Sequence, residues 1–377
     1  MDDVTAMGVP PTAVRAVRGR DNPLDELTRY LRASIFGQDG AIDSIVRGLN
    51  RARYGFSVGR RDRPVAVLLF LGPTGVGKTE TARRLAHYLH PEGDGLLKID
   101  CSLFSQGHEV AALVGAPPAY VGRDQRPLFD TEVIERPNSV VLFDEIEKAS
   151  SEFRHLMLQI MEDGEVTLLN GGRRVDFRQS IIIMTSNVGA RDMMNYIQGR
   201  RLGFGAAPRA ACGVGETIHS IGVSALRKAF TPEWLNRIDE IVTFRPLEAE
   251  TLAAVLDRML AEANEQYLRH GLRVRLTARA RGALLADGYA PEFGARPLRA
   301  RLMQAIEAPL ADLLASGGVP EGCDVWADAA PTPQAEQGLA FYYAPNDALL
   351  AVAREYRLRE AAPCARDVEQ AVMAMAR

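Results

Sequence analysis

Four short apolar runs, separated by helical patterns, constrain the fold of this chain more than any other feature. The runs are Val65–Leu71, Leu96–Ile99, Val140–Phe143 and Ile181–Met184. Largely apolar runs of this length are typical of strands buried on both faces of a parallel sheet. Helical patterns lie between them, at 78–90 and 150–162. Strands that alternate with helices predict an α/β domain with a parallel sheet.

The remaining sequence predicts a second, smaller and mainly helical domain. After Phe244 we expect no further buried parallel strand. Helical stretches at 247–270, 278–287 and 297–315 would pack with short strands near 271–276, 324–327 and 338–343. Residues 204–222 are rich in Gly and Ala and predict a long loop. The predicted division is a loose arm at 1–22, an α/β domain at 23–244, a helical lid domain at 245–345 and a helical tail at 346–377.

Composition excludes several classes of protein. The 45 Lys and Arg against 48 Asp and Glu leave a net charge of −3, so the whole chain has no attraction to nucleic acid or an anionic membrane. No apolar run approaches the roughly 20 residues that a membrane span requires. The first residues lack the apolar core of a signal peptide. The four cysteines form no C-x-x-C pair, which disfavours a disulfide scaffold and favours a reducing cytoplasm.

The segment Gly72-Pro73-Thr74-Gly75-Val76-Gly77-Lys78-Thr79 fits the phosphate-loop pattern G-x-x-x-x-G-K-[ST]. It lies between the first apolar run and the 78–90 helix, which is the context the pattern requires. The glycines allow backbone N–H groups to surround phosphate oxygens at the positive end of the helix. Lys78 can reach the β- and γ-phosphates, and the Thr79 hydroxyl can ligate Mg²⁺. This arrangement favours a nucleotide site over a Gly-rich turn with a surface lysine.

Polar side chains follow two later strands of the expected sheet. Asp144 and Glu145 end the 140–143 strand; Asp144 is a candidate ligand of Mg²⁺, and Glu145 a candidate to polarise the attacking water. Thr185 and Asn187 follow the 181–184 strand. Because the carboxyl ends of parallel strands line one crevice, either side chain can contact the water or the γ-phosphate. An ordinary turn or helix cap is the alternative for Asn187.

These motifs resemble the second, C-terminal ATPase module of the Clp AAA+ unfoldases and disaggregases of the ClpA, ClpB and ClpC type. The matching stretches are Phe70–Glu80, Gly115–Gly122, Ser139–Ser150, Ile183–Ala190, Phe230–Phe244 and Phe293–Arg299. They occur in the family's order and cover about residues 25–345. The resemblance implies an AAA+ domain with a parallel sheet, a small helical lid domain, ATP and Mg²⁺ as cofactors, and a homo-hexameric ring.

The resemblance also implies roles for residues outside the phosphate loop. Arg237 matches the arginine finger, a guanidinium that stabilises charge on the nucleotide of the neighbouring subunit; by itself it reads as a surface arginine paired with Asp239. Arg296 matches the arginine with which the lid senses the γ-phosphate, with a helix cap as the alternative. Ile35 and Phe36 match the segment that lines the adenine pocket.

Two loops match the substrate pore of the family. Tyr120 and Val121 match the pore loop that grips unfolded polypeptide, where an aromatic ring offers a large contact area with few rotatable bonds. The segment from Glu162–Gly164 to 171–174 matches the second pore-facing loop. Ala119 replaces the family's usual Gly, and 123–127 replaces an acidic, Gly-rich stretch, so the substrate preference is open.

The tripeptide Leu202-Gly203-Phe204 resembles the apolar loop with which ClpA- and ClpC-type unfoldases dock on the ClpP peptidase. A loop folded onto its own domain is the alternative interpretation.

Two function classes follow from these observations. The first is an ATP-driven unfoldase that threads protein substrates through a ring pore and feeds a peptidase. The second is an AAA+ remodeller or switch that acts on nucleic acid or on one fixed partner. Arginine-rich patches at 60–63 and 173–178 are compatible with the second class, whereas the net charge and the Tyr120 loop favour protein substrates.

Overall fold

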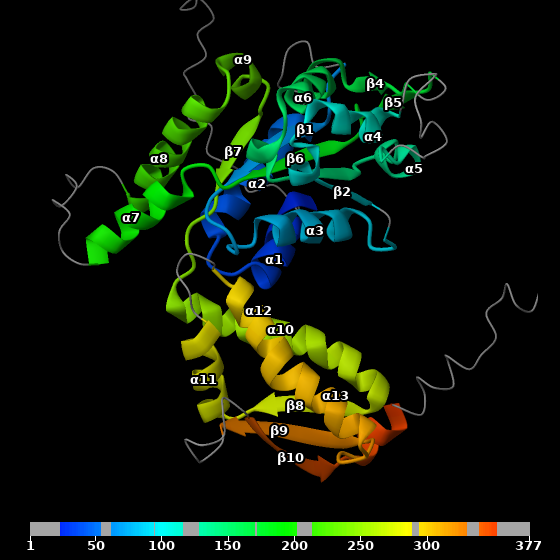
Figure 1. The fold of residues 1–377 in the computed structure, drawn as a ribbon, viewed down its shortest axis with the longest axis vertical. Helices are drawn as coiled ribbons and strands as arrows, with labels where there is room; N and C mark the ends of the chain where they lie inside the picture. Colours follow the sequence, from blue (N-terminus) through cyan, green and yellow to red (C-terminus); the bar gives the residue numbers. More distant parts are fainter. Residues whose placement is uncertain are drawn as a thin grey trace, which may run out of the picture.

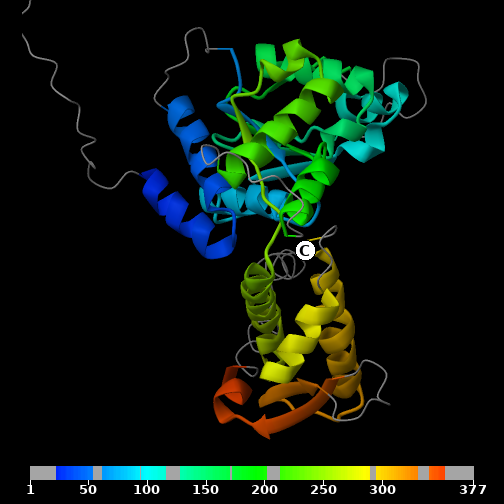
Figure 2. The same ribbon diagram turned by 90° about the vertical axis from the view of Figure 1, so that its left-hand side faces the viewer.

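The computed structural model describes residues 23–53, 62–93, 95–115, 128–169, 172–201, 213–288, 294–329 and 339–352. These residues form an α/β part, from α1 to β7, and a smaller part, from α10 to β10. The two parts lie one above the other in Figures 1 and 2. Among the described helices none is long and apolar enough to cross a membrane.

A five-stranded sheet forms the centre of the α/β part, in the order β2-β3-β6-β1-β7. Its strands are β1 (Ala66–Leu71), β2 (Leu96–Asp100), β3 (Val140–Asp144), β6 (Ile181–Ser186) and β7 (Glu240–Thr243). Every neighbouring pair is parallel, which confirms the predicted parallel sheet. Only β7 was not among the predicted strands. It is an edge strand in which Val242 alone is fully buried, so it lacks the continuous apolar run of the central strands.

Alternating residues of each strand face two different helical layers. Leu68, Phe70 and Leu142 belong to one apolar cluster, while Val67 and Phe143 belong to the other. The first layer contains α1 (Pro23–Ser34), α2 (Asp39–Arg53) and α3 (Lys78–Leu89). The second contains α4 (Ala111–Val114), α5 (Thr131–Ile134), α6 (Ser151–Asp163), α7 (Ala190–Arg201), α8 (Val214–Ala229) and α9 (Pro232–Leu235). Burial on both faces explains why the central strands are apolar without interruption.

The prediction of a loop over 204–222 is wrong for its second half, because α8 begins at Val214. Ile218, Gly222 and Leu226 recur at helical spacing and are buried. A side chain at Gly222 would collide with Leu71, so this glycine permits close packing of α8 on the sheet rather than marking a loop. Residues 202–212 lie outside the described part of the chain.

Shorter elements complete the α/β part. Strands β4 (Glu165–Thr167) and β5 (Arg174–Asp176) pair as an antiparallel hairpin within the segment matched to the second pore-facing loop. The 3₁₀ helices are η2 (Cys101–Phe104), η3 (Gly107–Val110) and η4 (Ile146–Lys148).

The smaller part packs helices on a three-stranded sheet of order β10-β9-β8. Its elements are α10 (Ala249–Tyr267), η5 (Leu268–His270), β8 (Leu272–Leu276), α11 (Ala278–Gly288), α12 (Arg296–Leu302), the π-helix η6 (Met303–Glu307), α13 (Ala308–Ala315), β9 (Cys323–Ala329) and β10 (Leu339–Pro345). The predicted helices and the three short strands are confirmed in type and approximate position.

The predicted short sheet contains one parallel pair, β8 and β9, although no further buried parallel strand was expected after Phe244. The helices between them carry the chain back to the same end of the sheet. Strand β8 is buried on one face only: Leu272 and Val274 are buried, whereas Arg273 and Arg275 pair with Asp324.

Candidate active site

A cleft of about 320 Å³ lies between the two parts, in the size range of small-molecule sites. It is bordered by the phosphate loop, the carboxyl ends of β3 and β6, and helices α3, α10 and α12. The two parts meet beside it, where the Ala295 N–H donates to the Gly75 carbonyl at 3.0 Å. Gly294 has φ +59°, and a side chain there would collide with the backbone of Gly75 and Thr74. A glycine is therefore required where the chain entering α12 contacts the phosphate loop.

The phosphate loop ends at Gly77, the N-cap of α3, with φ 102° and no side-chain cap. Backbone N–H groups of the first helical turn thus remain available for an anion. Lys78 is buried, and its Nζ donates to the carbonyls of Gly72 and Pro73, at 2.6 Å each, and to Asn187 Oδ1 at 2.7 Å. Burial lowers the pKa of Lys78 to about 8, against the attraction of nearby carboxylates.

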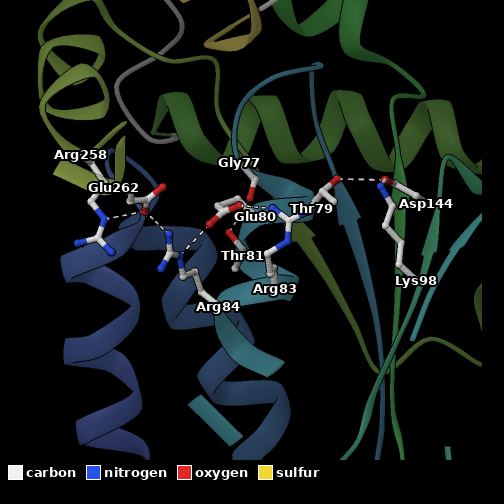
Figure 3. A network of polar contacts seen from close by, with 10 residues as sticks. All are labelled: Gly77, Thr79, Glu80, Thr81, Arg83, Arg84, Lys98, Asp144, Arg258 and Glu262. Carbon is white, nitrogen blue, oxygen red and sulfur yellow. Dashed lines mark hydrogen bonds and ion pairs between the residues drawn. The ribbon is translucent and has the colours of Figure 1, made fainter. Parts of the chain in front are cut away.

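Asp144 receives hydrogen bonds from three side chains. Thr185 Oγ1 donates to its Oδ1 at 2.5 Å, and Lys98 Nζ lies 2.8 Å from its Oδ2. The Thr79 hydroxyl lies 3.2 and 3.3 Å from the two carboxylate oxygens (Figure 3). Burial opposes the ionisation of Asp144, but the bonds from Lys98 and Thr185 outweigh it and hold the pKa below its usual value. The carboxylate is therefore charged at neutral pH.

Glu145, the next residue, has a left-handed backbone with φ 60° and ψ 49°. Such a conformation is costly for a residue with a side chain and often marks a functional position. The Glu145 N–H donates to Thr185 Oγ1 at 2.9 Å, so one hydroxyl holds both carboxylate residues. The Glu145 carboxylate forms an ion pair with Lys148 at the edge of the cleft.

The donor set at this position fits Mg²⁺. The Thr79 hydroxyl and the Asp144 carboxylate are hard oxygen ligands within hydrogen-bonding distance of each other. The described residues contain no cluster of three or more His, Cys, Asp or Glu that would form an all-protein metal cage. Mg²⁺ commonly takes one or two carboxylates and completes its shell with water and phosphate oxygens.

The apolar lining of the cleft comes from both parts of the molecule. Ile35 and Phe36, which were expected to contact the base of the nucleotide, line the cleft together with Leu247, Val255 and Met259. Gln38 is buried nearby; its amide exchanges hydrogen bonds of 2.8 and 2.9 Å with the backbone of Arg245. This pair ties the loop after α1 to the segment that joins β7 to α10.

The smaller part contributes charged groups to the same cleft. Arg296, the first residue of α12, is exposed and lines the cleft as predicted. Arg84 on α3 pairs with Glu262 on α10, which also accepts from Arg258 Nε at 2.9 Å. Glu80 accepts from Arg84 Nε at 2.7 Å, so a charged ladder of Glu80, Arg84, Glu262 and Arg258 runs from α3 across to α10 (Figure 3).

Arg237 lies at the amino end of the sheet and does not line the cleft of its own chain. It pairs with Glu162 on α6, not with Asp239 as the alternative interpretation expected. The Asp239 carboxylate instead accepts from Val67 N–H at 2.9 Å. The Arg237 side chain is 37% exposed, which leaves it accessible to another molecule.

The structure therefore brings most predicted site residues together. Lys78, Thr79, Asp144, Glu145 and Asn187 meet in one cleft with Ile35, Phe36 and Arg296. Tyr120 and Val121 of the pore loop, and the Leu202-Gly203-Phe204 tripeptide, lie outside the described residues.

Sequence reasoning missed Lys98, the Arg84–Glu262 pair and Glu147, whose Oε1 accepts from Asn187 N–H at 3.0 Å. The signal for Lys98 was available, because a lysine interrupts an otherwise apolar strand.

Comparison with known proteins agrees with this geometry. Residues 63–241 match the family model of the AAA domain (Cdc48 subfamily), and residues 247–327 match the C-terminal, D2-small domain of ClpB protein. The ATP-dependent Clp protease ATP-binding subunit ClpC of Staphylococcus epidermidis is 37% identical over 321 residues, which is 85% of this chain and 38% of that protein. The ClpC proteins of Staphylococcus saprophyticus and Staphylococcus aureus are each 38% identical over the same length. The chain spans 38% of the length of these relatives. It is therefore homologous to ClpC and belongs, through its AAA domain and ClpB-type small domain, to the Clp family of AAA+ ATPase modules.

Proposed function

We propose that the chain binds Mg²⁺ and ATP in the cleft between its two parts and hydrolyses ATP to remodel protein substrates. The observation that carries this proposal is the convergence of Lys78, Thr79, Asp144, Glu145 and Asn187 on one cleft. ATP hydrolysis depends mainly on positioning and on neutralising charge. A lysine, a metal ligand, a carboxylate for the water and a polar sensor are the groups that this chemistry requires.

Each residue has one task in this proposal. The phosphate loop, Gly72 to Thr79, holds the phosphates through backbone N–H groups, and Lys78 moves from the loop carbonyls to the β- and γ-phosphates. Thr79 and Asp144 hold Mg²⁺, which supplies charge neutralisation. Glu145 orients and deprotonates the attacking water, and Asn187 contacts the water or the γ-phosphate. Arg296 contacts the γ-phosphate from the lid.

The position of Arg237 supports a ring. A group at the amino end of the sheet cannot serve the cleft at the carboxyl end of the same sheet. We therefore assign Arg237 to the nucleotide of a neighbouring copy in a homo-hexamer, with residues 23–244 as the ATPase domain and 245–345 as the lid domain. The matches to ClpC and to the ClpB small domain support this assignment.

In this proposal Tyr120 and Val121 grip polypeptide in the central pore, and the chain acts in the cytoplasm as an unfoldase. Docking of Leu202-Gly203-Phe204 on a ClpP-like peptidase is the corresponding partner proposal, since the relatives are named as subunits of the Clp protease.

The arginine-rich patch at 173–178 does not support the alternative function of acting on nucleic acid. Arg173 pairs with Glu135, and Arg174 and Arg178 pair with Glu165. Arginines committed to carboxylates do not present the free basic stripe that binds phosphate backbones.

Paired measurements of ATP turnover and substrate unfolding on the same preparations test the proposal. Glu145→Gln should bind ATP but nearly stop hydrolysis, because the site keeps its shape while the water loses its base. Tyr120→Ala should hydrolyse ATP at nearly the wild-type rate yet fail to unfold a tagged test protein, and Tyr120→Phe should retain most unfolding.

Normal turnover in Glu145→Gln would remove the catalytic assignment. Undiminished unfolding in Tyr120→Ala would instead favour the switch that acts on a fixed partner.

A further inference from the structure

Lys98 contacts the carboxylate that the proposed function assigns to Mg²⁺. It lies on β2, which neighbours β3 in the sheet, and its Nζ is 2.8 Å from Asp144 Oδ2 (Figure 3). Both residues line the cleft. The Lys98 side chain is 43% exposed, whereas that of Asp144 is 14% exposed. A half-exposed ammonium on a long stem thus neutralises a mostly buried carboxylate.

A metal ion held by Asp144 would meet this ammonium at the same carboxylate. Like charges so close together repel strongly, because the surroundings of Asp144 are shielded from water. One of the two cations must therefore withdraw when the other approaches.

The other donors to Asp144 are less free to move. Thr185 is 1% exposed, and its hydroxyl donates to Asp144 while it accepts from the Glu145 N–H at 2.9 Å. Thr79 would stay in place as a ligand of the metal. Among the described donors to Asp144, Lys98 alone has both an exposed side chain and a flexible stem on which to leave.

We propose that Lys98 is a positioning residue that competes with the divalent metal for Asp144, so that the metal binds as Lys98 withdraws. This inference rests on the proposed function, in which Thr79 and Asp144 hold Mg²⁺. Lys98 keeps Asp144 neutralised until a metal–nucleotide complex arrives, and it thereby weakens the affinity of the site for the metal. A purely structural ion pair would change stability without changing metal affinity.

The inference can be tested without any measurement of turnover. The full chain is saturated with ADP and titrated with Mn²⁺, and Mn²⁺ binding is followed by electron paramagnetic resonance. Lys98→Met removes the competing charge and keeps the apolar stem. The Mn²⁺ concentration at half-saturation should fall by roughly tenfold or more. Lys98→Arg keeps the positive charge and should remain close to the wild type. Lys228→Met, an equal loss of charge at an exposed position of α8, is the matched control and should not change Mn²⁺ binding.

The outcomes separate the inference from the proposed function on which it rests. Unchanged or weaker Mn²⁺ binding in Lys98→Met, with the wild type binding Mn²⁺ normally, would overturn the inference alone. A wild type that binds ADP but no Mn²⁺ would instead overturn the assignment of the metal site.

Should Lys98→Met fail to bind ADP without metal, Lys98→Gln carries the same expectation. Acetylation of Lys98 in the wild-type ADP complex, measured by mass spectrometry, offers a second readout. Labelling should increase when Mn²⁺ is added, because the ammonium leaves Asp144 for solvent. Unchanged or decreased labelling would count against the competition.

Discussion

The two ends of the parallel sheet are built for different purposes. At the carboxyl end, Lys78 donates to Asn187 and to the phosphate-loop carbonyls, and Asp144 accepts from Thr79. All of these residues but the loop's Gly72 and Pro73 line the cleft. At the amino end, Arg237 pairs with Glu162, and Arg63 Nη2 donates to the Arg237 carbonyl at 2.7 Å. One end holds the groups for phosphate and metal, and the other holds an accessible arginine far from them.

This difference indicates what one chain provides and what it lacks. In the proposed function, the carboxyl end supplies the groups that bind the nucleotide and position water. A further positive charge near the γ-phosphate would have to come from the amino end of another copy. The experiments below test this division of labour, beginning with the largest expected effect.

Arg237→Ala should reduce ATP turnover by roughly a thousandfold and leave ATP affinity nearly unchanged, as expected for an arginine finger. The arginine does not line the cleft of its own chain, so its loss removes no contact to the bound nucleotide there. Steady-state turnover and equilibrium binding of a fluorescent ATP analogue on the same preparation separate the two quantities.

Mixed rings provide the control for Arg237→Ala. Lys78→Ala removes the charge that faces the phosphates and should abolish nucleotide binding. A mixture of the two variants contains interfaces with an intact cleft and an intact arginine, so part of the activity should return. No recovery in rings shown to contain both variants would contradict action between subunits.

The pH dependence of nucleotide affinity tests the carboxyl end by itself. Lys78 has a pKa of about 8, and bound phosphates stabilise its charged form further. Below pH 8 the lysine is protonated with and without nucleotide, so affinity should not change. Above pH 8, binding must take up a proton, and affinity should fall by up to about tenfold per pH unit. Titration of fluorescent ADP without divalent metal measures this slope.

Lys78→Arg is the control for the pH experiment, because arginine remains charged throughout the range. Whatever its absolute affinity, this variant should show no such slope. A wild-type affinity that stays constant from pH 8 to above pH 9 would mean that Lys78 does not set the charge of the site.

The parallel sheet and the phosphate site were predictable from sequence because their signals are local. Continuous apolar strands and the run from Gly72 to Thr79 need no knowledge of distant residues. The position of Asp144 followed from the rule that parallel strands end at one edge.

Other features depended on contacts between distant segments and were not predictable. Gly222 reads as a loop residue in sequence, and its role emerges only when α8 packs against Leu71. Lys98 pairs with Asp144, and Glu262 pairs with Arg84, each on a different element. Their roles could therefore not be inferred from the local sequence. The pairing of Arg237 with Glu162 rather than with nearby Asp239 likewise follows from the position of α6.

The smallest expected effect concerns the contact between lid and ATPase part at the mouth of the cleft. Glu262→Gln breaks the ion pair that joins α10 to Arg84 on α3. Arg84 is 20% and Glu262 is 40% exposed, so solvent screening limits the pair to about 1 kcal/mol or less. If the pair holds the lid over the bound nucleotide, fluorescent ADP should dissociate up to about fivefold faster from the variant.

Measurements at high ionic strength distinguish the loss of this ion pair from a change in packing. At high ionic strength the wild-type pair is screened, and the dissociation rates of wild type and variant should converge. Glu265→Gln, an equal loss of charge at an exposed position of the same helix, is the matched control and should release ADP at the wild-type rate. Equal rates for Glu262→Gln and the wild type at low salt would show that the lid is held at Gly294 and Ala295 instead, where its backbone bonds directly to the phosphate loop. The position of the lid would then depend on bound phosphates through its contact with Gly75, and not through the charged ladder that includes Arg84 and Glu262.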